Sequence, residues 1–154
     1  MSHQETTAIQ SSELQIIQAQ RQQIEEASED QFLASWEWDR MLFCLGEECD
    51  RFNADPWIKN LEPAPALRLE HLRPLWSRLT YTCGNIRHVM HVTYSVPLQC
   101  CAFQIHGQPT AYEHRLIVRD GKAYFQAFQS REEAARRILR VFFSETADHP
   151  SVVQ

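Results

Sequence analysis

Four residues able to act as nucleophiles or metal ligands lie in the middle of the chain: Cys83, His88, Cys101 and His114. Their predicted strands place all four on one apolar sheet face, where thiolate and imidazole ligands would suit zinc. No two of them form a C-x-x-C or H-x-x-H pair on that face, because residues three apart in a strand point oppositely. We therefore interpret them as core residues and predict neither a metal ion nor a cofactor.

The same four residues define the enzyme alternative. Cys83 beside His88 is the one thiol–base pair that the predicted hairpins bring together, as nucleophilic catalysis would require. Apolar surroundings would raise the pKa of that thiol and leave it inert. The four glycines are isolated, so no phosphate-binding loop is present. These patterns favour a protein without catalytic activity and leave a thiol- or metal-dependent enzyme as an alternative.

The elements that would position these residues are β-hairpins. Asp120-Gly121 and Gly84-Asn85 are two-residue turn signals between runs of alternating apolar and polar residues. Alternation predicts an antiparallel meander of about five strands over 76–128, with one face covered by helix. The predicted cross-strand pairs are Leu79–Met90, Tyr81–His88, Cys83–Ile86, Leu116–Phe125, Val118–Ala123 and Arg119–Lys122.

Helical patterns flank the sheet. The pattern predicts a helix with a thin apolar face over 12–26, a helix with a wide apolar face over 28–52 and a short helix over 66–73. Ser130 begins a final helix, with Glu133 completing a capping box. The fold class is therefore α+β, with N-terminal helices, a meander and a C-terminal helix packed on one face of the sheet.

The expected organisation is a single domain between two tails. Within the connector, Trp57 and Ile58 are expected to reach the core. The expected segments are a disordered tail 1–11, a domain 12–143 (helical 12–53, connector 54–75, sheet 76–128, helix 130–143) and a polar tail 144–154.

Amino-acid composition leads to a prediction of the cellular compartment. No apolar run reaches the roughly 18–20 residues that a membrane helix needs, so no membrane partner is predicted. The five cysteines are odd in number and lack a framework spacing, which predicts reduced thiols and a cytoplasmic location.

Charge divides the chain. Residues 1–62 hold 13 acidic and 4 basic residues, a net charge of −9, whereas residues 63–154 carry +4. The simplest interpretation is that the acidic helical half neutralises the basic sheet half within one molecule. The doubly apolar helix 30–52, the acidic patch within it and before it, and the missing catalytic set predict a non-catalytic protein-binding module, such as an adaptor, accessory subunit, chaperone or inhibitor, with a homodimer as a companion hypothesis. The predicted partner-binding residues are Glu25, Glu26, Glu29, Asp30, Phe32, Trp36 and Phe43.

The exposed sheet face gives the second functional alternative. Cations interleaved with aromatic rings on a sheet are typical of proteins that bind single-stranded nucleic acid. The overall charge of −5 opposes this, since phosphate neutralisation supplies most non-specific affinity. The residues predicted for this alternative are Arg78, Arg87, Arg115, Arg119, Lys122 and Tyr124.

Overall fold

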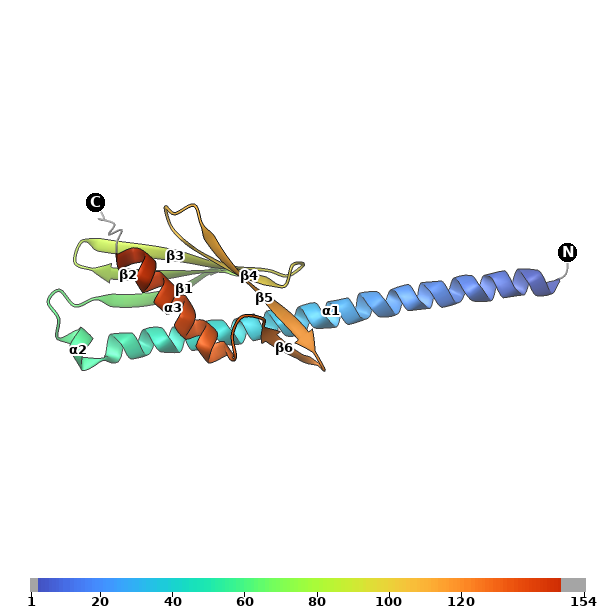
Figure 1. The fold of residues 1–154 in the computed structure, drawn as a ribbon, viewed down its shortest axis with the longest axis horizontal. Coiled ribbons are helices and arrows are strands. Elements are labelled where there is room, and N and C mark those ends of the chain that lie inside the picture. Colours follow the sequence, from blue (N-terminus) through green and yellow to red (C-terminus); the bar gives the residue numbers. More distant parts are fainter. Residues whose placement is uncertain (1–2, 148–154) are drawn as a thin grey trace.

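The computed structural model describes the backbone of residues 3–147, and the side chains of residues 11–147 except 24, 26 and 27. One long helix and one shorter helix pack on a six-stranded antiparallel sheet, as Figure 1 shows. The α+β class is confirmed, with six strands rather than about five. The elements in order are α1 (His3–Ala54), α2 (Pro56–Lys59), β1 (Ala66–Arg73), β2 (Trp76–Cys83), β3 (Ile86–Ser95), β4 (Cys100–Ile105), β5 (Ala111–Arg119), β6 (Lys122–Phe125) and α3 (Arg131–Ala147).

Helix α1 is one continuous element where two helices were predicted. No proline or glycine separates residues 26 and 28, so nothing in the backbone requires a break there. The helix already runs at His3, and the described part of the expected tail 1–11 is therefore helical. Its N-terminal part projects past the sheet and α3 as a rod (Figure 1), and every side chain from Ser11 to Gln23 is exposed.

The sheet is a meander in which each strand pairs with its neighbours in sequence. Both predicted hairpins are confirmed: Leu79 faces Met90, and Leu116 faces Phe125. Asp120 and Gly121 have φ angles of 53° and 73°, as the predicted turn requires. The remaining predicted pairs, Tyr81–His88, Cys83–Ile86, Val118–Ala123 and Arg119–Lys122, are confirmed as well.

The prediction of a short helix over 66–73 is wrong, because these residues form the edge strand β1. The sheet therefore starts at Ala66 rather than at residue 76. Leu69 pairs with Leu79 of β2. Asn53 at the end of α1 secures the strand: its amide donates to the carbonyl oxygen of Leu67 (2.7 Å) and accepts from the N–H of Leu67 (2.8 Å).

Helices α1 and α3 cover the apolar face of the sheet. Trp38 of α1 stacks on Tyr94 of β3 with ring centroids 5.2 Å apart. Helix α3 begins as predicted, since the N–H of Glu133 donates to Ser130 Oγ (3.1 Å). It continues to Ala147, past the predicted end at residue 143, and residues 148–154 of the expected polar tail lie outside the described part of the chain. The fully buried side chains of this core include Ala34, Trp38, Met41, Leu45, Leu79, Met90, Val92, Phe103, Ile138 and Phe142.

The connector differs from expectation at one aromatic residue. Trp57 was expected to reach the core but lies in α2 with 85% of its surface exposed, while Ile58 is half-buried. Asp55 begins this short helix by accepting a hydrogen bond from the N–H of Trp57 (2.9 Å). None of the helices in the described residues is both long and apolar enough to span a membrane.

Candidate protein-binding surface

Three aromatic side chains form a line on the outer side of α1. Phe32, Trp36 and Phe43 are 68%, 50% and 70% exposed. At 100° per residue they lie within about 40° of one another around the helix, and they extend over about 16 Å along it. We call these three residues the aromatic stripe.

The aromatic stripe exists because α1 carries apolar residues on two opposite sides. Trp38, Met41 and Leu45 face the sheet and are buried. The stripe lies on the other side of α1 and is at least half exposed, although Trp36 lines a hollow beside β6 and Phe43 lines one beside residues 71–77. Large apolar residues scattered singly on a surface are ordinary, whereas three aligned rings on one helix make a larger exposed apolar patch, and such patches mark candidate interaction sites.

A groove of about 530 Å³ runs beside the aromatic stripe. One wall is α1, the second is the β5–β6 hairpin and the third is the start of α3. Trp36 contributes its ring from α1, and Tyr124, which is 46% exposed, contributes its ring from β6. The groove-lining residues are Leu33, Trp36, Glu37, Arg40, Gly121, Lys122, Ala123, Tyr124, Gln129, Ser130, Arg131 and Glu132.

Charged side chains give the groove its polarity. The guanidinium of Arg40 lies 3.9 Å from the ring centroid of Trp36, close enough for a cation–π interaction. Arg131 makes a two-pronged ion pair with Glu37, with Nε–Oε1 and Nη2–Oε2 distances of 2.8 Å, and this pair joins α3 to α1. Lys122 is exposed at the mouth of the groove. The groove therefore offers aromatic surface from Trp36 and Tyr124 together with the cations of Arg40 and Lys122.

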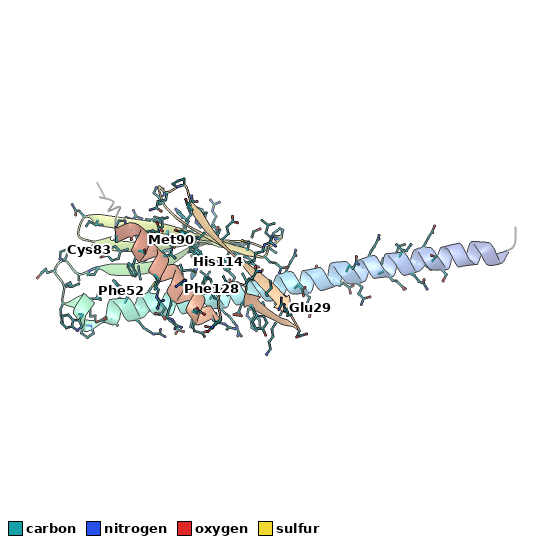
Figure 2. All side chains as sticks on the ribbon, viewed as in Figure 1. Glu29, Phe52, Cys83, Met90, His114 and Phe128 are labelled. Atoms are coloured by element: carbon teal, nitrogen blue, oxygen red, sulfur yellow. The ribbon has the colours of Figure 1, made fainter. Side chains whose placement is uncertain are left out.

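The predicted acidic residues lie within two turns before the aromatic stripe on the same helix. Glu25 and Glu29 are exposed, Asp30 is half-buried, and the side chain of Glu26 lies outside the described set. Glu29 marks the point where α1 leaves the body of the protein (Figure 2). Glu25 and Glu29 therefore lie on the same side of α1 as the aromatic stripe, whereas Asp30 lies about 160° from Phe32 around the helix and is not part of that surface.

The residues predicted for nucleic-acid binding do not form one continuous surface. Arg78 pairs with Glu70 of β1 (Nη2–Oε2, 3.2 Å), so part of its charge is neutralised. Arg87 lies on β3, whereas Arg115 and Arg119 are exposed on β5, which turns away towards α1 (Figure 1). The other two members, Lys122 and Tyr124, lie in the groove beside Trp36.

The four Cys/His candidates separate into two groups. Cys101 and His114 face each other across β4 and β5. Cys83 and His88 both belong to the β2–β3 hairpin, where Cys83 pairs with Ile86 at its end (Figure 2) and His88 pairs with Tyr81. His114 stacks between Phe103 and Phe128, with ring centroids 5.2 and 4.6 Å away. Among the described residues, no group of three or more His, Cys, Asp or Glu side chains is arranged to hold a metal ion.

Burial makes the central thiols unreactive. It raises the pKa of Cys101 to about 12, and Cys49, also buried and next to Asp50 and Glu48, has its pKa raised to about 12. Burial lowers the pKa of His114, which therefore stays neutral near pH 7 and does not provide an imidazolium to stabilise a Cys101 thiolate.

Alkylation rates should reflect this burial. At pH 8 a pKa of about 12 leaves about a thousandfold less thiolate than an ordinary cysteine has. We expect Cys49 and Cys101 to resist iodoacetamide in the native protein and all five cysteines to react in denaturant, as measured by mass spectrometry of peptides. Rapid modification of Cys101 in folded protein would contradict the packing role and restore the thiol-enzyme alternative.

Sequence patterns alone did not reveal the groove. Its walls come from segments that are almost 90 residues apart, and that proximity exists only in the folded chain. One local signal was available, because Trp36 and Arg40 are four residues apart on a helix and such residues are neighbours on its surface. Comparison with protein-family models, with curated proteins and with solved structures found no match to this chain.

Proposed function

We propose that this protein is a non-catalytic protein-binding module, in the class of adaptors, accessory subunits, chaperones and inhibitors, and that its partner contacts the outer side of α1. The observation that supports this is the aromatic stripe, whose rings are exposed and aligned opposite the sheet. Aromatic residues and arginine contribute most to binding energy at interfaces, and Arg40 stands directly beside Trp36.

The shape of this surface favours a helical partner segment. A line of apolar side chains on a helix is covered most completely by the apolar side of another helix, which places its own side chains between them. The acidic residues Glu25 and Glu29 continue the same side of α1. Basic residues on the partner would therefore fix its direction along α1 and exclude acidic competitors.

The experiment is affinity capture from host lysate, with and without nuclease, by the wild-type chain and by the triple variant Phe32→Ala, Trp36→Ala, Phe43→Ala. We expect a stoichiometric protein partner with the wild type and at least about a tenfold loss with the variant, because hot-spot aromatic residues typically contribute 2 kcal/mol or more each. Quantitative mass spectrometry of the eluates measures both.

The matched control is the double variant Trp57→Ala, Leu98→Ala, whose side chains are 85% and 64% exposed but lie outside the stripe. It should capture the partner as the wild type does. Equal capture by the stripe variant would refute the proposed surface. Loss of all captured protein on nuclease treatment would refute protein binding and favour nucleic acid at Lys122 and Tyr124.

A further inference from the structure

The outer side of α1 changes its charge along its length. Between Arg21 and Arg40 the sequence contains no basic residue, and Glu25 and Glu29 are exposed on the same side of α1 as the aromatic stripe. Farther along the helix, Arg40 adjoins the groove that Lys122 also lines. A surface with an acidic half and a basic half is able to pair with a reversed copy of itself.

The basic half extends beyond the groove. A second hollow, lined by Gln129, Ser130, Glu133 and three arginines of α3, shares two residues with it. The pair between Arg131 and Glu37, and the bond from the N–H of Gln129 to Glu133 (2.7 Å), engage two of the acidic groups internally. The cations of the two hollows are Arg40, Lys122, Arg131, Arg136, Arg137 and Arg140, and their acids are Glu37, Glu132 and Glu133.

We propose that the first occupant of the aromatic stripe is a second copy of this chain, bound antiparallel about a two-fold axis that passes beside Phe32 and Leu33. This inference rests on the proposed function, because the contact uses the same stripe, with Phe32 at its centre. With the axis there, Glu25 lies opposite the partner's Arg40, and Glu29 lies opposite the partner's Trp36. Each acidic segment then enters the groove of the other copy.

The geometry of a two-fold axis supports this pairing on the correct side of the helix. An antiparallel pair related by such an axis brings the same flank of both helices together. Glu29 and Arg40 project from the same flank of α1, within about 20° of each other around the helix, and the groove lies on that flank. The acidic and basic groups therefore meet directly instead of lying on opposite sides of the aromatic contact.

Charge also selects the direction of the pair. A parallel dimer would place Glu25 against the partner's Glu25 and Glu29 against the partner's Glu29, with like charges facing each other. The antiparallel dimer replaces these repulsions with attractions. Because both copies use the same surface, the contact closes on itself and gives a dimer rather than a filament.

The test is a charge exchange followed by light scattering. The wild type should have twice the 18.0 kDa chain mass at low salt, and higher ionic strength should weaken the dimer. An acid-swapped variant, Glu25→Lys with Glu29→Lys, and a base-swapped variant, Arg40→Glu with Lys122→Glu, should each dissociate at least about tenfold more readily. Mixing the two variants should restore a dimer, because both charged contacts are then complementary.

A control variant tests whether the charge effect is specific to the contact, and a pairing preference tests whether the two helices are antiparallel. The double variant Glu113→Lys, Thr110→Lys puts two lysines on the exposed end of β5 and its preceding loop and should dimerise as the wild type does. Swapped variants that each dimerise as readily as the wild type, or an acid-swapped variant that pairs with the wild type more tightly than the wild type pairs with itself, would indicate a parallel pair and overturn the proposal.

Two further outcomes distinguish this inference from the proposed function. A wild type that stays monomeric at the highest concentration reached, yet captures another protein through Phe32, Trp36 and Phe43, overturns the dimer and supports the proposed function. A dimer that is weakened by each charge exchange and restored by mixing the two variants, but captures no other protein, supports the inference and refutes the wider binding function.

Discussion

Replacing Trp38 with alanine is expected to lower the free energy of unfolding by about 3–5 kcal/mol. The indole is 2% exposed and stacks on Tyr94, so its removal leaves a cavity between α1 and the sheet. Domains of this size have a total stability of about 5–15 kcal/mol, and one substitution would therefore remove a large part of it. Urea unfolding followed by far-UV circular dichroism measures the loss.

The matched control is Trp36→Ala, two residues away on the same helix. Trp36 is 50% exposed and stands on the outer side of α1. Its replacement should change the free energy of unfolding by less than about 1 kcal/mol, because surface substitutions seldom cost more. Equal losses from the two variants would mean that α1 does not face the sheet as described.

Replacing Asn53 with alanine is expected to lower the free energy of unfolding by about 1–3 kcal/mol, because it leaves polar backbone groups without partners. The Asn53 side chain makes both hydrogen bonds of Leu67 at the edge of the sheet, and Leu67 itself is buried. Asn53→Asp keeps the acceptor for the N–H but turns an anion towards the carbonyl oxygen, so it should be no more stable than Asn53→Ala. Denaturant midpoints at constant slope measure both.

A second asparagine provides the comparison. Asn60 is exposed and ends α2 through its backbone N–H, which the substitution to alanine retains. We expect Asn60→Ala to lie within about 0.5 kcal/mol of the wild type. If Asn53→Ala were equally mild, the edge strand β1 would not depend on its contact with α1.

The sheet was predictable where turns fix the register locally. Gly84 and Asp120-Gly121 adopt the positive φ angles that their hairpins require, and the alternation around them then determines which side chains face the core. The alternation stops where β6 ends, at Phe125. The chain then turns, so Phe128 packs against His114 on the core side.

Strand β1 was not predictable, because its own residues point to a different structure. Ala, Leu, Arg and Glu in residues 66–73 favour a helix, and Pro74 fits a helix end. Residues 66–73 form a strand because they pair with β2 and because Leu67 makes two hydrogen bonds with Asn53, 14 residues earlier. Tertiary contacts of this kind override local propensity. The groove beside Trp36 depends on contacts between residues that are even farther apart in the sequence.

The order of elements along the chain has a consequence for biosynthesis. Helix α1 leaves the ribosome first, but α3, which packs against it, ends only at Ala147. At about 5–20 residues per second, the intervening 93 residues take about 5–20 s to translate. During that interval Trp38, Met41 and Leu45 have only part of their final cover. The strands pair only with sequence neighbours, so they are able to form in order as they emerge. Helix α1 gains its contact with α3 only when α3 has been synthesised.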